Sequence, residues 1–189
     1  MKASELLHKN LSAACPEIHK VRLSSLIAAV NSTLSGQQVN RSTGQQVTVT
    51  GLGRNLREHS VTHTKHDIKR MDRLVDNQHL HGERQAIYHY FSHLLIGQQK
   101  HPVLIVDWSP IPGNSLFQLH RLSIPMGGRT LTIYEECFEE KNLNNTQVHN
   151  RFLDELEALL PEGCQPIILS DPFTKRLGLK PSKPKAGIG

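Results

Sequence analysis

Aromatic residues, cysteines and long apolar runs are all scarce in this chain of 189 residues. Aromatic side chains make up 5% of the sequence, with a single Trp. No apolar run approaches the ~20 residues that cross a membrane, and the segment from Met1 to Leu7 lacks the apolar centre of a secretory signal. The three cysteines, Cys15, Cys137 and Cys164, stand far apart without the spacing of a metal or redox motif. These absences predict a reduced, cytoplasmic protein whose cysteines are small buried residues.

Charge is distributed in three blocks along the chain. Residues 1–100 hold 13 Lys and Arg against 7 Asp and Glu, a net charge of +6, together with 9 of the 12 His. Residues 101–171 hold 4 Lys and Arg against 10 Asp and Glu, a net charge of −6. The last 18 residues hold 5 Lys and Arg and no Asp or Glu. A basic first half favours a polyanionic partner such as DNA. The acidic middle suits metal binding better than direct phosphate contact.

Apolar residues recur at helical spacing through the first half of the chain. One helix is expected from Ser4 to the interruption at Cys15-Pro16, and a second from Pro16 to Ser35-Gly36. Residues 36–46 are polar and predict a connection. A further helix is expected over residues 78–97. The first 99 residues therefore predict an all-helical domain.

A helix-turn-helix is the preferred interpretation of residues 47–75. Alternation within residues 47–57 is also typical of a strand, but a short turn at residues 59–62 and a helix capped by Thr62 or Thr64 follow it. A basic helix after a short turn is how many proteins enter the major groove of DNA. The alternative is a solvated basic face. The expected DNA contacts are Arg54, Arg57, Lys65, Lys69, Arg70 and Arg73.

Two short apolar segments in the second half each lead into an aspartate. Val103–Val106 precedes Asp107, and Pro166–Ser170 precedes Asp171. The first segment predicts a strand that is buried on both faces and ends at Asp107. If the two strands are neighbours, about 4.8 Å apart, their carboxylates lie side by side, and a divalent cation relieves the repulsion between them. Either aspartate alone is more typical of a turn or a helix cap than of a metal ligand.

The intervening segments predict the order β-β-β-α-β over residues 100–171. Strands are expected at residues 102–108, 115–124 and 129–137, with turns at Pro110–Gly113 and Gly127-Gly128, and a helix at residues 145–160. The fold class is therefore α+β, with an all-helical DNA-binding region followed by a mixed sheet.

Three segments resemble one protein family. Val-Leu-Ile-Val-Asp107-Trp-Ser and Pro-Ile-Ile-Leu-Ser-Asp171 resemble the first two acidic motifs of bacterial cut-and-paste insertion-sequence transposases with a DDE site. The segment from Asp67 to Leu80 resembles the DNA-binding segment of that family. The resemblance implies a ribonuclease-H-like fold over residues 100–171. It also implies that Asp107 and Asp171 are catalytic ligands of Mg²⁺ in phosphodiester cleavage and strand transfer, and that Trp108 supports the site. The partners that it implies are double-stranded DNA at transposon ends and either a second copy or a full-length transposase.

The sequence departs from the family after Asp171. Pro172-Phe173-Thr174 replaces an Ala-Gly-Phe-type motif, and no residue matches the family's later glutamate, which lies on a helix with Tyr, Arg and Lys. Residues 172–189 are basic and have almost no core-forming pattern. One nucleotide sequence that could encode most of this tail, when it is translated in another reading frame, gives a peptide that resembles the family's continuation after its second aspartate. We therefore expect an incomplete ribonuclease-H-like domain with a frameshifted tail and a C-terminally truncated, inactive transposase. The alternatives are a DNA-binding regulator that competes with full-length transposase, a decayed product without a role, and another ribonuclease-H-like nuclease.

Overall fold

The computed structural model describes residues 3–43, 48–56, 63–111, 113–143 and 145–170, and for residues 36–43 it describes the backbone alone. Contacts divide the chain into two compact units, Met1–Tyr90 and Phe91–Gly189. The described residues form six α-helices and one four-stranded mixed sheet, so the α+β class is confirmed. No helix among them is long and apolar enough to cross a bilayer.

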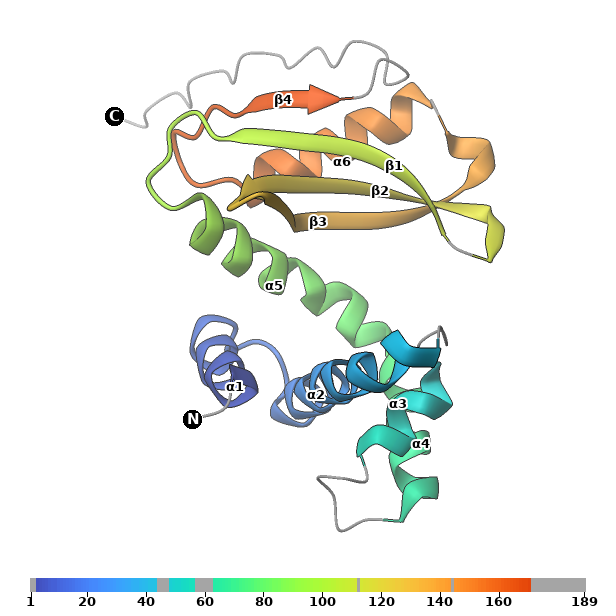
Figure 1. Ribbon diagram of the computed structural model, residues 1–189. Helices are drawn as coiled ribbons and strands as arrows, with labels where there is room; N and C mark the ends of the chain where they lie inside the picture. Colours follow the sequence, from blue (N-terminus) through green and yellow to red (C-terminus); the bar gives the residue numbers. More distant parts are fainter. Residues whose placement is uncertain (1–2, 44–47, 57–62, 112, 144, 171–189) are drawn as a thin grey trace. The chain divides into compact units, whose positions relative to one another are not determined.

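The first unit is helical, as predicted (Figure 1). Its helices are α1 (Ala3–Ala14), α2 (Lys20–Thr43), α3 (Val49–Asn55) and α4 (Thr64–Val75), and α5 (Gln78–Ile96) begins in it. The helical interpretation of residues 47–57 is confirmed over α3. The predicted end of the second helix at Ser35-Gly36 is wrong, because α2 continues to Thr43.

Helices α2, α3 and α4 enclose one apolar core. Leu56, Met71 and Leu74 are its buried centre, and the partly buried side chains packed on them are Ala28, Ala29, Val49, Leu52 and Leu80. The hydroxyl of Ser32, which is fully buried on α2, donates a hydrogen bond to the carbonyl of Leu52 on α3. The N-cap of α4 is His63, without a side-chain capping bond, so neither predicted threonine caps this helix. The predicted turn at residues 59–62 lies outside the described residues.

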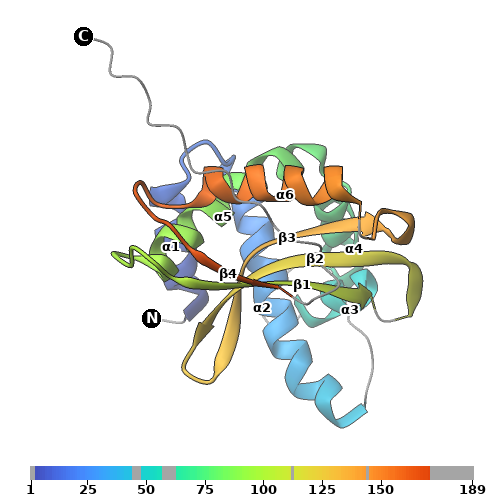
Figure 2. The same cartoon turned by 90° about the horizontal axis from the view of Figure 1, so that it is seen from above.

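The sheet of the second unit has the strand order β3-β2-β1-β4 (Figures 1 and 2). Its strands are β1 (Val103–Ile111), β2 (Asn114–Met126), β3 (Arg129–Glu139) and β4 (Ile167–Ser170). β1 pairs with β2 and β2 with β3 in antiparallel fashion, whereas β1 and β4 are parallel. The β2–β3 hairpin turns at Gly127 and Gly128, both with positive φ, as a tight primed turn requires.

One further helix, α6 (Thr146–Leu159), covers one face of the sheet (Figure 2). It follows the short 3-10 turn Glu140–Asn142, and the side chain of Asn145 caps it by accepting a hydrogen bond from the Gln147 amide. Its buried face consists of His149, Phe152, Leu156 and Leu159. The order β-β-β-α-β that the sequence predicted is therefore confirmed.

Two details of the first strand differ from expectation. β1 continues past Asp107 to Ile111, because β2 pairs with it through Pro110, so the predicted turn at Pro110–Gly113 begins inside the strand. The strand is also not buried on both faces: Leu104 and Val106 are buried, whereas Val103 is 37% exposed. Among the cysteines, Cys15 is buried as expected and Cys137 is exposed.

Candidate metal and DNA-binding sites

The two strands that carry the predicted aspartates are neighbours in the sheet. β1 and β4 pair in parallel from Val103↔Ile167 to Val106↔Ser170. Asp107 follows Val106 directly, one residue beyond the last described pair with β4. Asp171 is the next residue after Ser170 and lies outside the described residues. The condition set by the sequence argument, that these two strands are neighbours, is therefore met, and the position of the second carboxylate stays a prediction.

Asp107 is an exposed carboxylate on the sheet face opposite α6. Its neighbour Trp108 contacts His149 of α6, and successive residues of a strand point to opposite faces. The hydroxyl of Ser109, two residues along the same face, donates a 2.9 Å hydrogen bond to Oδ2 of Asp107. Within the described part of the chain, no cationic group forms an ion pair with this carboxylate.

A row of charged residues crosses three strands on this face. Arg121 on β2 is the cross-strand partner of Asp107 on one side and of Glu135 on the other. Nε of Arg121 donates a 3.1 Å hydrogen bond to Oε2 of Glu135, and both side chains are 37% exposed. The arginine between two carboxylates is therefore paired with Glu135 and not with Asp107.

The donor chemistry of Asp107 fits a hard divalent cation, which takes oxygen ligands. The carboxylate is exposed, and Ser109 occupies one of its oxygens. Among the described residues, no group of three or more His, Cys, Asp or Glu is arranged to hold a metal ion. The residues that could bind Mg²⁺ are thus Asp107 and the undescribed Asp171, and a third ligand is not found in the described ranges.

Beneath Asp107, on the α6 side, lies a ring cluster of the half-buried Trp108 and the buried His120, His149 and Phe152. The ring of Trp108 stacks on His120 at 4.1 Å between centroids and 7° between planes, and the His120 ring lies 5.1 Å from that of His149. Burial, and then the neighbouring His149, lower the pKa of His120 to about 3. Burial also lowers the pKa of His149. Both rings are therefore neutral at pH 7, and this cluster supports the strand from within the core.

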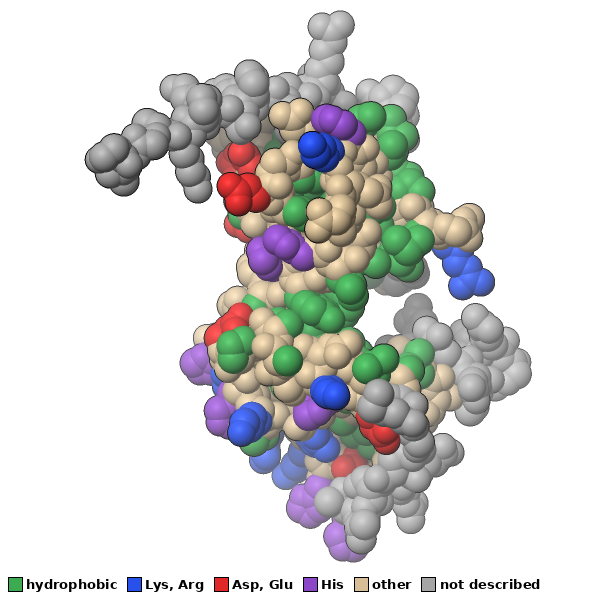
Figure 3. All heavy atoms as spheres, turned by 90° about the vertical axis from the view of Figure 1, so that its left-hand side faces the viewer, with side chains coloured by type: hydrophobic (Ala, Val, Ile, Leu, Met, Phe, Trp, Pro, Cys, Tyr) green, Lys and Arg blue, Asp and Glu red, His purple; other side chains and the backbone are tan. Residues whose placement is uncertain are grey.

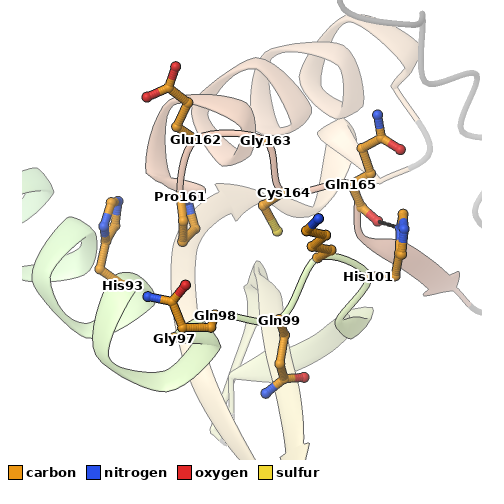
Figure 4. Close-up of a pocket in the computed structure, with 11 residues that line it drawn as sticks. His93, Gly97, Gln98, Gln99, His101, Pro161, Glu162, Gly163, Cys164 and Gln165 are labelled. Carbon is orange, nitrogen blue, oxygen red and sulfur yellow. Dashed lines mark hydrogen bonds between the residues drawn. The ribbon is translucent and has the colours of Figure 1, made fainter.

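A separate cavity of about 690 Å³ lies at the opposite end of β1 and β4 (Figure 4). Two loops line it, residues 97–101 after α5 and residues 161–165 before β4, with His93 beside them. The sulfur of Cys164 points into the cavity, whereas Glu162 points away from it. Burial raises the pKa of the Cys164 thiol, so this thiol is not an activated nucleophile. The cavity belongs to the amino ends of the parallel strands and does not include Asp107.

The predicted DNA contacts lie on the helical unit, over which Lys, Arg and His side chains are visible (Figure 3). Lys65, Lys69 and Arg73 are exposed on α4 at intervals of four residues, so they form one stripe. Asp72 on the same helix and Asp76 at its C-cap are also exposed, so the surface around the stripe is mixed in charge.

The other three predicted contacts differ from this stripe. Arg54 is exposed near the end of α3. Arg70 is exposed as a residue, but its Nε donates a 3.0 Å hydrogen bond to the hydroxyl of Ser25 on α2, so it also holds two helices together. Arg57 lies outside the described residues.

Sequence reasoning overlooked the partners of Asp107. Ser109 has a usable signal, because residues i and i+2 of a strand share a face. Arg121 and Glu135 give no such signal in the sequence, because their place beside Asp107 depends on the register of three strands.

Comparison of this chain with protein-family models, with curated proteins and with solved structures finds no match.

Proposed function

We propose that this chain is a DNA-binding protein of the DDE transposase type, with an incomplete ribonuclease-H-like catalytic sheet. The observation that carries the proposal is the parallel pairing of Val106 with Ser170, because it makes neighbours of the two strands that lead into Asp107 and Asp171. The β-β-β-α-β order is a second support.

In this proposal the helical unit binds double-stranded DNA. The phosphates contact Lys65, Lys69 and Arg73. Like charges four residues apart on a helix repel one another, and a bound polyanion reduces this repulsion. Arg54, near the end of α3, extends this contact with the phosphates. Arg70 contributes through the α2–α4 packing that presents the stripe.

In the same proposal Asp107 and Asp171 hold Mg²⁺, which when bound polarises phosphoryl oxygens and water. Ser109 orients the Asp107 carboxylate, and Trp108 anchors that segment of β1 in the core. The described residues supply no third ligand beside Asp107. Because a site short of one ligand loses affinity and geometry, we expect little strand transfer by this chain.

A DNA-binding regulator is the second candidate. It is favoured by the core of α2, α3 and α4, which lies within the first unit and holds the helix that carries the stripe. A regulator of this kind would occupy the ends of the element and exclude an active transposase from them.

The test is binding of the full chain to a duplex of mixed sequence over a series of salt concentrations. The variant Lys65→Gln/Lys69→Gln/Arg73→Gln should bind at least about tenfold more weakly, and its salt dependence should fall by roughly 0.9 per phosphate contact that is lost. A matched control, Lys9→Gln/Lys20→Gln/Lys100→Gln, removes the same charge from exposed positions elsewhere. Equal losses in the two variants would show that net charge, and not α4, binds DNA.

The catalytic half is tested with Mn²⁺ or Mg²⁺ and a nicked or linear DNA substrate. We expect at most weak cleavage, abolished by Asp107→Asn. Efficient strand transfer by the chain alone would contradict the expected deficiency of the metal site.

A further inference from the structure

We infer that His120 and His149 form an acid-sensitive contact between α6 and the sheet, which releases α6 in mild acid while the strands stay paired. His120 lies on β2 and His149 on α6, so their rings meet where the helix packs on the sheet (Figure 2). Neither the DNA-binding stripe nor the metal site takes part in this contact, which lies within the second unit.

The imidazole ring of His120 is enclosed by rings from β1 and α6. Its centroid lies 4.1 Å from that of Trp108, 3.9 Å from that of Phe152 and 5.1 Å from that of His149. His120 is 1% exposed and His149 is 7% exposed. The two histidines are therefore part of the core that joins α6 to the sheet.

Both imidazoles are buried without a hydrogen-bond partner. In the part of the chain that the structure describes, no group bonds Nδ1 or Nε2 of His120 or of His149. A neutral imidazole carries one donor and one acceptor, and burial of such atoms without partners costs free energy. Release of α6 gives these nitrogens access to water, which offsets part of the cost of exposing the apolar face of the helix.

The charged side chains around the pair are engaged elsewhere. Glu136 on β3 is the cross-strand partner of His120. Its carboxylate accepts hydrogen bonds from Arg151 of α6 at 2.6 Å and from the hydroxyl of Tyr134 at 3.2 Å. The charged residues next to the cluster along β1 and β2 point to the opposite face of the sheet. Among the described residues, a proton bound by either ring thus gains no hydrogen bond to a carboxylate.

Protons therefore favour the released form. Burial, and then the neighbouring His149, lower the pKa of His120 to about 3, and burial lowers the pKa of His149. A ring whose pKa is lowered by packing binds its proton more tightly once the packing is lost. The stability that the pair contributes is complete above the ordinary pKa of 6.5 and is lost as the pH falls. Two protonated rings at 5.1 Å would also repel each other.

The pairing of the strands does not depend on these rings in the same way. β2 is hydrogen-bonded to β1 on one side and to β3 on the other, through backbone groups that do not titrate. Release of α6 uncovers the buried Phe152 and Leu156. The acid form should therefore keep its strands and lose the fixed packing of α6, as compact acid states of proteins do.

Hydrogen–deuterium exchange of the full chain, resolved by peptide and corrected for intrinsic exchange rates, measures the opening of α6 beside that of β2 and β3. At pH 5 the protection of α6 should be at least about tenfold lower than that of the strands. From pH 6 to pH 5 the opening constant of α6 should rise between about tenfold and a hundredfold, because each histidine that binds a proton on opening contributes about tenfold per pH unit. Equal protection of α6 and the strands at pH 5 would show that the unit opens as a whole, and the inference would be wrong.

Variants then identify the groups that bind the protons. His120→Phe and His149→Phe each keep a ring and remove its titration, so each should reduce the pH dependence of α6 opening, and the double variant should show less than about a twofold change from pH 6 to pH 5. If His149→Phe is not folded at pH 7 by far-ultraviolet circular dichroism, His149→Gln replaces it, since glutamine does not titrate either. His101→Gln, at an exposed position before β1, is the matched control and should behave as the parent chain does. A pH dependence that survives in the double variant would assign the acid sensitivity to other groups and overturn the role of the pair.

Discussion

Gly53 lies against Ile68 so closely that a β-carbon on Gly53 would stand 2.5 Å from the Cα of Ile68. The neighbouring atom belongs to the backbone of α4, so no rotation of a side chain can relieve the contact. α3 and α4 therefore cross at this glycine, and the position of the cationic stripe depends on it.

Gly53→Ala should destabilise the helical unit by about 2–3 kcal/mol or more, because overpacking at a fixed backbone contact forces the helices apart. The measurement is thermal unfolding followed by far-ultraviolet circular dichroism. Gly82→Ala on α5 is the matched control, since a β-carbon there meets no atom within 4 Å, and we expect it to stabilise by roughly 0.5–1 kcal/mol. Similar melting temperatures for the two variants would contradict the close crossing.

The acid sensitivity of the second unit should depend on His120. The pKa of His120 in the folded chain, about 3, lies below its ordinary value of 6.5. Between these two pH values the unfolded state binds a proton at His120 and the folded state does not. The stability that this contributes is complete above pH 6.5 and is lost as the pH falls toward 3. His120→Phe keeps an aromatic ring against Trp108 and removes the titration.

We therefore expect the parent chain to lose roughly 3 kcal/mol more than His120→Phe between pH 7 and pH 4, which corresponds to one proton over about 2.5 pH units. Urea unfolding followed by the fluorescence of Trp108 measures the free energy of unfolding of the second unit, which contains His120, at each pH. His149, whose pKa burial also lowers, should add to the acid sensitivity that remains in the variant. Parallel pH profiles for the two chains would exclude His120 as the group responsible.

The sequence predicted the element types well where the signals are local. The helices of the first unit and the Gly127-Gly128 hairpin follow from periodicity and turn chemistry, whereas the adjacency of the strands before Asp107 and Asp171 was only a condition of the sequence argument. The end of β1 did not follow, because Pro110 is an unusual residue inside a strand and only pairing with β2 shows that the strand continues.

Features that arise between distant segments were not predictable in the same way. The ion pair between Arg121 and Glu135 and the stack of His120 on Trp108 require a cross-strand register that no local pattern encodes. The bond from Arg70 to Ser25 is a further case, since a cation on a helix gives no sequence signal of whether it faces DNA or a neighbouring helix.

The ion pair of Arg22 with Glu83 should stabilise the helical unit in a pH-dependent way. The guanidinium of Arg22 on α2 hydrogen-bonds both carboxylate oxygens of Glu83 on α5. It holds the pKa of Glu83 below its ordinary value. The contribution is therefore present above the ordinary carboxyl pKa of about 4.3 and is lost as the pH falls through the lower folded value.

Glu83→Gln should accordingly lower the melting temperature at pH 7. Its effect should be smaller at pH 3, below the ordinary carboxyl pKa of about 4.3, where protonation of Glu83 in the unfolded chain has begun to remove the contribution of the ion pair. Thermal unfolding at the two pH values measures the difference. Glu17→Gln, at an exposed position before α2, is the comparison for loss of one acidic charge. An effect of Glu83→Gln that is the same at both pH values would show that the ion pair contributes nothing beyond its hydrogen bonds.

Arg73 and Arg70, three residues apart on α4, should affect DNA binding in different ways. Arg73 is exposed in the cationic stripe, so Arg73→Gln should weaken binding and lower its salt dependence by about one phosphate contact, without changing the melting temperature. Arg70 is bonded to Ser25, so Arg70→Gln should lower the melting temperature of the helical unit, and Ser25→Ala should reproduce that loss. Gel-shift titrations at several salt concentrations, read beside thermal unfolding, separate the two roles. If Ser25→Ala leaves stability unchanged while Arg70→Gln lowers the salt dependence as Arg73→Gln does, then Arg70 faces DNA directly and the stripe on α4 is wider than Lys65, Lys69 and Arg73.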